Sequence, residues 1–287
     1  MTERCPSRES SMTVINRSCP RASLRGGMKA IRLCGFALSF LAGLGAAAFF
    51  PLLPRAARHT ITRLWSRAVL FGLGVRLEAQ GELAPGPALV VANHISWMDV
   101  LAIAALRPCV FICKSDVAAW PVLGWLLTRV DTIFMRRGSA RAASRAMRAA
   151  LARLRAGTTV ALFPEGTSTD GDQVLPFAAA IFQAAVDAGC PVQPLAIAYS
   201  SPEAVYAGGT GFGESLLAVA GARGLRVRLT VLPALKSIER RDAAVRSHEL
   251  IELSLRAGTL TAAAGHAAAG TVEGDLVALP AGRPGLV

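Results

Sequence analysis

Apolar and polar positions follow a regular order beyond residue 81, where short apolar runs are separated by stretches with helical periodicity. Apolar runs of this length, alternating with helix patterns, are typical of buried strands in an α/β layer. We therefore expect a mixed, largely parallel sheet flanked by helices. The predicted strands are residues 88–92, 110–113, 132–135, 159–163, 194–198 and 225–232.

The last predicted strand differs from the others in its pattern. Leu225, Val227 and Leu229 alternate with Arg226 and Arg228. A period of two places the apolar side chains on one face of a strand and the charged side chains in water. The pattern therefore predicts a strand with one wet face, at an edge of the sheet.

A polar tail and an apolar segment precede the predicted sheet. Residues 1–27 are rich in Ser and Arg and lack apolar periodicity, which predicts a disordered tail and makes Met28 the expected initiator. Residues 33–53 carry no charge and would cover roughly 32 Å as a helix, about the thickness of a bilayer core. We expect a retained membrane helix, although Lys29 and the alanine triplet 46–48 also fit a cleaved signal peptide.

An amphipathic stretch follows the apolar segment. Arg55, His59, Arg63 and Arg67 recur every four residues, with apolar residues on other faces. This is the pattern of an interfacial helix on a membrane, which the preceding apolar segment favours over an ordinary helix packed on a domain. Basic residues flank the apolar segment on both sides, so the positive-inside rule gives no orientation, and a shallow hairpin with both ends in the cytosol stays open.

These patterns divide the chain into four parts. The predicted parts are a disordered N-terminal tail (1–27), a membrane anchor with an interfacial helix (28–75), a catalytic domain (76–256) and a flexible Ala- and Gly-rich C-terminal tail (257–287).

Composition narrows the class of partner. The chain is 53% hydrophobic and carries a formal net charge of +12, which favours an anionic membrane surface or a phosphorylated substrate. Aromatic residues make up 6% of the chain and do not alternate with basic ones, so no nucleic-acid partner is expected. The six cysteines are scattered without zinc-site spacing, which indicates reduced thiols on the cytosolic side and no metal site.

The polar residues that follow the strand at 88–92 are the first candidates for catalysis. His94 and Asp99 are five residues apart, so on one continuous helix they would face different directions and could meet only across a bend. A His in the loop and an Asp in the next helix's first turn would form a general base. Alternatively, Ser96 to Asp99 fits a capping box, in which Asp99 only satisfies a helix amide.

Other polar residues stand at the ends of predicted strands. Arg136 and Arg137 follow residues 132–135, and an arginine's planar fork suits phosphate. In the turn after residues 159–163, Glu165 could bond a substrate hydroxyl or orient an arginine, and Thr167 could donate to phosphate. Each also fits a plain loop. Lys114 at a strand end is ordinarily solvated, and the glycine-rich 208–213 fits a flexible loop better than a phosphate cradle.

Four blocks in this order resemble the membrane-associated glycerolipid acyltransferases of the 1-acylglycerol-3-phosphate acyltransferase family. The blocks are Asn93-His94-x4-Asp99, Phe134-x-x-Arg137 with Asp131 where the family has glycine, Phe163-Pro164-Glu165-Gly166-Thr167, and the Pro-centred run 191–197. The resemblance implies that His94 is the catalytic base and Asp99 its orienting carboxylate. It also implies substrate-binding roles for Asn93, Lys114, Phe134, Arg137, Glu165, Gly166 and Thr167.

The resemblance further implies acyl transfer from a thioester to the sn-2 hydroxyl of 1-acyl-sn-glycerol 3-phosphate, giving phosphatidic acid. The expected donor is acyl-CoA or acyl-ACP, which makes acyl carrier protein a further partner, and no bound cofactor is expected. The expected location is the cytosolic face of the inner membrane. Two alternatives stay open: an acyltransferase for another lysolipid such as lyso-ornithine lipid, and a non-catalytic lipid-binding protein at the membrane surface.

Overall fold

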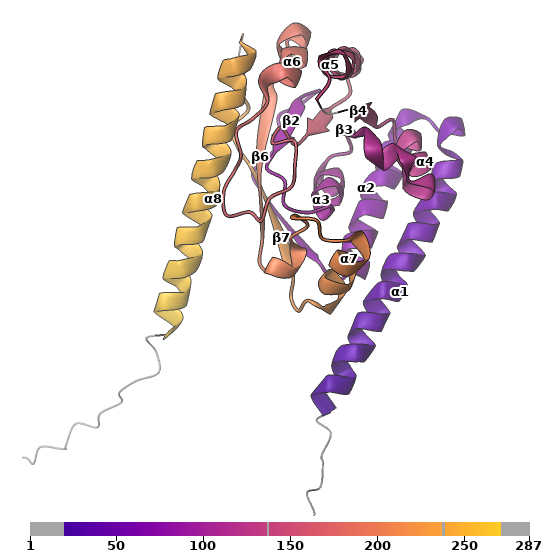
Figure 1. The fold of residues 1–287 in the computed structure, drawn as a ribbon, viewed down its shortest axis with the longest axis vertical. Coiled ribbons are helices and arrows are strands. Elements are labelled where there is room, and N and C mark those ends of the chain that lie inside the picture. The colour runs from indigo at the N-terminus through magenta and orange to yellow at the C-terminus, as the bar shows by residue number, and fades with distance from the viewer. Residues whose placement is uncertain (1–19, 137, 237–238, 271–287) are drawn as a thin grey trace, which may run out of the picture.

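A computed structural model describes residues 20–136, 138–236 and 239–270. Within these residues the chain forms a seven-stranded sheet in the order β1-β7-β6-β2-β5-β3-β4 (Figure 1). Every neighbouring pair is parallel except β6 and β7, which are antiparallel. The strands are β1 (Arg76–Gln80), β2 (Leu89–Ala92), β3 (Val110–Lys114), β4 (Ile133–Met135), β5 (Val160–Leu162), β6 (Val192–Tyr199) and β7 (Arg226–Val231). The predicted mixed, largely parallel sheet is confirmed.

β1 was not predicted from the sequence, and the edge position predicted for β7 is wrong. β7 does have one wet face, since Val227 and Leu229 are buried while Arg226 and Arg228 are exposed. However, β1 pairs with it on the outside, and Glu78 of β1 forms ion pairs with both arginines at 3.9 and 3.7 Å. The wet face is thus a solvent-facing side of the sheet rather than a sign of an edge.

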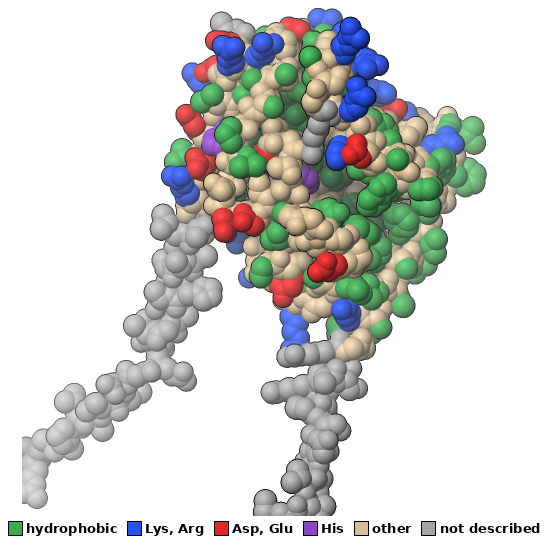
Figure 2. Space-filling view, in the orientation of Figure 1, with side chains coloured by type: hydrophobic (Ala, Val, Ile, Leu, Met, Phe, Trp, Pro, Cys, Tyr) green, Lys and Arg blue, Asp and Glu red, His purple; other side chains and the backbone are tan. Residues whose placement is uncertain are grey.

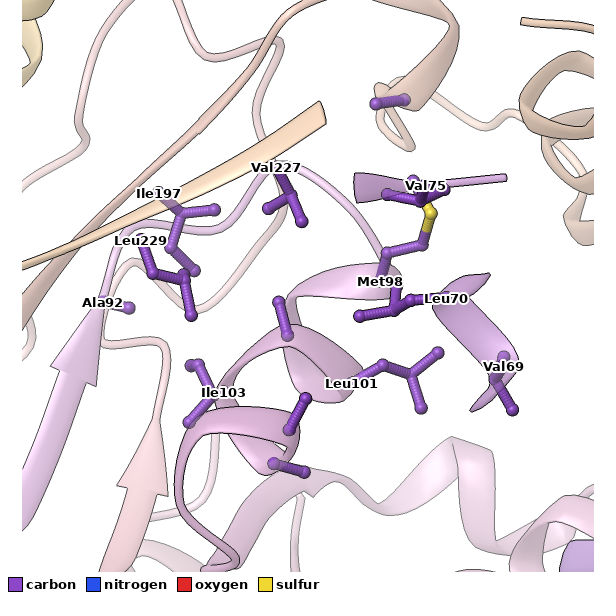
Figure 3. Packing of buried hydrophobic residues seen from close by; sticks show 14 of the residues in the cluster. Val69, Leu70, Val75, Ala92, Met98, Leu101, Ile103, Ile197, Val227 and Leu229 are labelled. Atoms are coloured by element: carbon purple, nitrogen blue, oxygen red, sulfur yellow. The ribbon is translucent and has the colours of Figure 1, made fainter. Parts of the chain in front are cut away.

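Helices cover both faces of the sheet. The helices are α3 (Met98–Leu106), α4 (Pro121–Arg129), α5 (Ala140–Arg155), α6 (Gln183–Ala188), α7 (Phe212–Gly221) and α8 (Arg240–Gly270), with short 3-10 turns η2 (Ser115–Ala119), η3 (Ala179–Phe182) and η4 (Pro202–Ala204). Val90 and Ala92 of β2 face one core, which they share with α3, α7 and a further helix, α2 (Arg55–Gly72) (Figure 3). Leu89 and Val91 face the other, shared with α5, α6 and α8. Burial on both faces explains the continuous apolar run of β2.

Two helices at the N-terminal end pack together as a hairpin beside the sheet (Figure 1). They are α1 (Pro20–Ala48) and α2 (Arg55–Gly72), joined by η1 (Phe50–Leu52). Two glycines of α1 are contact points for α2: a Cβ on Gly35 would lie 3.1 Å from the Gly72 carbonyl oxygen, and one on Gly43 would clash with Trp65. Trp65 Nε1 also donates to the Ser39 carbonyl at 2.8 Å. These glycines allow close packing of the two helices.

The helix boundaries differ from those predicted. α1 begins at Pro20, inside the segment expected to be a disordered tail, and ends at Ala48 rather than Leu53. One stretch in the described part of the chain, Gly26–Ala48, is long and apolar enough to cross a membrane. α8 continues through the predicted C-terminal tail as far as Gly270. The tail residues 1–19 and 271–287 lie outside the described residues.

Candidate active site

Asn93 ties the end of β2 to the neighbouring strand β6. Its side-chain amide donates to the Ile197 carbonyl at 2.9 Å and accepts from the Ile197 N–H at 2.8 Å. The residue is 2% exposed. Both polar atoms of the side chain are therefore used within the protein, and they fix the start of the loop that follows β2.

That loop brings His94 and Asp99 together. His94 Nδ1 lies 2.8 Å from Asp99 Oδ2, across the bend that their spacing requires, with Asp99 in the first turn of α3. The same carboxylate oxygen accepts the N–H groups of Ile95 and Ser96 at 2.8 and 2.9 Å. The capping and orienting interpretations of Asp99 are therefore compatible, because one buried oxygen contacts both the loop amides and the imidazole.

Tyr199 completes the surroundings of Asp99. Its hydroxyl, at the end of β6, donates to Asp99 Oδ1 at 2.7 Å. Burial first, and then the charge of Asp99, raise the pKa of Tyr199 well above the usual range, so the phenol keeps its proton. Sequence reasoning missed this residue, although Tyr199 is one of only two tyrosines in the chain and follows the predicted strand 194–198 directly.

Glu165 holds the main chain at the same site. Its two carboxylate oxygens accept from the N–H of His94 at 2.7 Å and from the N–H of Leu175 at 2.9 Å. Burial raises the pKa of Glu165, and these two hydrogen bonds oppose that rise. The His94 side chain lies flat against the Phe163 ring, with centroids 4.1 Å apart and planes 12° from parallel. Residues of the third block thus position both the backbone and the ring of His94.

The other predicted substrate-binding residues stand apart from this group. Lys114 is exposed and pairs with Asp116, Phe134 is half-buried on β4, and Thr167 is exposed beyond Gly166. Among the described residues, no hydrogen bond or ion pair links them to His94, Asp99 or Glu165. Arg137 lies outside the described residues.

Asp131 explains the glycine that the second block has at this position in related sequences. Its φ is +63°, in the left-handed region that favours glycine. Asp131 occupies this conformation here and pairs with Arg58 at 3.4 Å and Arg153 at 3.1 Å. The departure from the block therefore preserves the turn.

The arrangement can act as a general base. The His94 side chain is 21% exposed, Nδ1 faces Asp99, and Nε2 has no hydrogen bond to any residue described. Neighbouring nucleophiles are unsuited to covalent catalysis: Ser96 is fully buried, and burial raises the pKa of the Cys113 thiol to about 11. Across the described ranges, no three His, Cys, Asp or Glu side chains form a metal-binding group.

Apolar side chains surround this part of the molecule. Trp97, next to α3, contacts Phe36 of α1 and Phe212 of α7 edge-to-face, with ring centroids 6.2 and 5.2 Å apart, and donates from Nε1 to Ser215 Oγ at 3.1 Å. Figure 2 shows hydrophobic side chains gathered over α1 and α4. The exposed ones near these elements and α7 are Leu38, Leu41, Trp120, Val122, Trp125 and Leu217. Such a surface suits a substrate with a hydrocarbon chain.

Comparisons with known proteins indicate the family of this chain. Residues 75–198 match the family model described as Acyltransferase. The chain is 39% identical over 186 residues to a lyso-ornithine lipid O-acyltransferase of Pseudomonas aeruginosa, covering 62% of this chain and 70% of that protein. It is also 39% identical over 149 residues to a 1-acyl-sn-glycerol-3-phosphate acyltransferase of Neisseria meningitidis, covering 51% and 58%.

A solved structure has the same fold. The crystal structure of the 1-acyl-sn-glycerophosphate acyltransferase PlsC from Thermotoga maritima superposes with a TM-score of 0.63 at 20% identity. The match covers 83% of this chain and 98% of that one.

Proposed function

This chain belongs to the acyltransferase family of the 1-acylglycerol-3-phosphate and lyso-ornithine lipid acyltransferases, and on that premise we propose that it transfers a fatty acyl group to the hydroxyl of a lysolipid. The observation that carries the proposal is the 2.8 Å contact between His94 Nδ1 and the buried carboxylate of Asp99, with Nε2 left for a substrate. A scaffold that only binds lipid has no need of such a pair.

The proposed reaction is direct acyl transfer. His94 Nε2 takes the proton of the lysolipid hydroxyl as that oxygen attacks the thioester carbonyl carbon. The carbon–sulfur bond then breaks, and the thiol leaves with the proton that His94 returns. Asp99 stabilises the imidazolium between these steps, and no acyl-enzyme forms. The donor is acyl-CoA or acyl-ACP, so acyl carrier protein is a proposed partner.

The first candidate acceptor is 1-acyl-sn-glycerol 3-phosphate, with phosphatidic acid as the product. Cationic residues support it: Lys114 ends β3 and Arg136 follows β4, and these two strands pair side by side. They lie at the carboxyl edge of the sheet, as His94 does, where α/β sheets bind ligands. The second candidate is lyso-ornithine lipid, which the longer of the two alignments favours.

We also propose that the protein works at the cytosolic face of the inner membrane. The exposed apolar side chains of α1 and α4 and the net charge of +12 support a location on an anionic bilayer. Arg32 of α1 donates to the Ala220 carbonyl of α7 at 3.2 Å. α1 is therefore fastened along the domain, which favours a shallow anchor over a helix that leaves the domain to span the bilayer.

The test is acyl transfer in membranes that contain the wild type or His94→Ala. Palmitoyl or oleoyl thioesters of CoA and of acyl carrier protein are offered with each acceptor in parallel. We expect His94-dependent product, with a loss of roughly 10²–10⁴-fold in the variant. Product from lyso-ornithine lipid alone would leave the proposed mechanism unchanged and make that lipid the acceptor. No product from either acceptor, or equal product from a folded His94→Ala variant, would overturn the proposal.

A further inference from the structure

A second polar site lies at the end of the sheet opposite His94. It is a recess between three helices and the amino ends of two strands. The helices are α2, α4 and α5, and the strand ends are Val110 of β3 and Thr158, which precedes β5. We call it the basic recess and define it by Arg55, Arg58, Arg129, Asp131, Arg153 and Thr158. β2, β3 and β5 run parallel, so the recess at the amino edge of β3 and β5 is separate from the candidate active site at the carboxyl edge of β2.

Positive charge dominates the basic recess. It contains four arginines and one carboxylate, Asp131, which pairs with Arg58 and Arg153. Arg129 lies 5.2 Å over the Trp125 ring, and Arg55 donates to the Ala156 carbonyl at 3.0 Å, so neither has an acidic partner in the recess. Burial, and next the charges of Arg55 and Arg58, lower the pKa of His59 in the same wall.

Two buried polar atoms of the basic recess have no partner in the described protein. They are Arg58 Nε, on a guanidinium that only one oxygen of Asp131 reaches, and Thr158 Oγ1, on a residue that is 3% exposed. An unpaired buried donor is unfavourable, and more so when it is charged. An anion with several oxygens would accept from both and would balance the excess of arginine.

The mouth of the recess has a volume of about 400 Å³, while the inner end holds about 40 Å³. Pro51 and Trp125 are the apolar residues of its lining, which also includes Arg58, Thr128, Arg129 and Asp131. Phe49 and Leu52, in the turn between α1 and α2 beside Pro51, are 62% and 81% exposed. A phosphate deep in the recess with hydrocarbon at its mouth is the chemistry of a phospholipid rather than of a free anion.

We propose that the basic recess binds the phosphate group of an anionic phospholipid and fixes the turn between α1 and α2 on the membrane. The phosphate oxygens accept from Arg58 Nε, Thr158 Oγ1 and the two arginines without acidic partners. The lipid's chains continue past Trp125 toward Leu52. This lipid is bound as part of the surface and is not consumed, which distinguishes the site from the one around His94.

Binding of short-chain phosphatidylglycerol to the full chain in detergent tests the proposal, by calorimetry, with short-chain phosphatidylcholine and inorganic phosphate as the other probes. The variant Arg55→Gln/Arg129→Gln removes two charges without breaking the Asp131 pairs. Thr158→Val removes one hydroxyl and no charge. The matched control is Arg145→Gln/Arg148→Gln, which makes the same charge change on the exposed face of α5.

We expect phosphatidylglycerol to bind more tightly than either other probe, and the Kd to rise about tenfold or more in the recess variant, less in Thr158→Val, and little in the control. Equal or tighter binding of inorganic phosphate would overturn the lipid headgroup as occupant. A Kd that is the same in the recess variant and in the control would overturn the site itself.

Discussion

Tyr199 donates a 2.7 Å hydrogen bond to Asp99 although the two residues lie 100 positions apart in the chain. The bond joins the end of β6 to the first turn of α3, and it occupies the carboxylate oxygen that does not face His94. The orientation of the proposed catalytic pair, His94 and Asp99, therefore depends on the register between β6 and β2 as well as on the loop that contains it.

Replacing Tyr199 by Phe removes this bond and leaves the ring in place. Hydrogen bonds to charged groups contribute about 1.5–3 kcal/mol, so we expect kcat to fall about tenfold. Tyr206→Phe is the matched control, because its hydroxyl makes no hydrogen bond to the described residues and its removal should leave kcat unchanged. Equal kcat values for both variants would show that Tyr199 is only a packing residue.

Asn93→Ala should act on stability. Removing the amide leaves the buried N–H and carbonyl of Ile197 without their partners, which costs about 1–3 kcal/mol for each group. We expect a clear drop in the midpoint of urea unfolding. An unchanged midpoint together with lost acyl transfer would instead support the predicted substrate-binding role of Asn93.

Glu165→Gln should change how stability depends on pH. Burial raises the pKa of Glu165, so the folded state holds this proton more tightly than the unfolded chain. Above the ordinary value of about 4.3, and up to the raised value, folding stability therefore falls as pH rises. The variant lacks this slope, so the wild type should lose stability relative to it between pH 4 and neutrality. Urea unfolding at several pH values measures the difference.

Glu203→Gln is a control in which stability should depend on pH in the opposite direction. The hydrogen bond from Ser201 lowers the pKa of Glu203, so its contribution is present above the ordinary value and is lost as pH falls. Parallel pH dependence in the two glutamine variants would contradict the burial of Glu165 in the folded state.

Two substitutions at Asp131 separate backbone conformation from charge. Both Asp131→Gly and Asp131→Ala lose the ion pairs to Arg58 and Arg153, but only glycine adopts the φ of +63° without strain. We expect the Ala variant to be less stable than the Gly variant by about 1 kcal/mol. Chemical denaturation compares them directly, and an Ala variant at least as stable as Gly would show that the turn rearranges.

Local patterns predicted much of this fold. The six predicted strands correspond to β2 to β7, because five are short apolar runs and the sixth alternates apolar with polar residues. β1 was not predicted because its sequence, Arg76 to Gln80, contains charged residues and lacks an apolar run. Its strand conformation depends on pairing with β7, and a short stretch of sequence does not show pairing with a distant strand.

The same limit separates the site residues. His94 and Asp99 could be paired from the sequence because five residues and one bend connect them. The partner of Asn93, Ile197, is 104 positions away, and no spacing rule reaches it. Glu165 was expected to hold substrate, and its hydrogen bonds to the His94 and Leu175 amides could not be predicted, because they depend on how separate loops pack at one edge of the sheet.

The pairing of β1 with β7 has a consequence for synthesis of the chain. Arg76 pairs with Arg226, so β1 gains its strand partner only after most of the domain has been synthesised. In contrast, α1 packs on α2, which follows it directly in the chain. We therefore expect the α1–α2 hairpin to form early in synthesis and the closure of the sheet around β7 to be the last step.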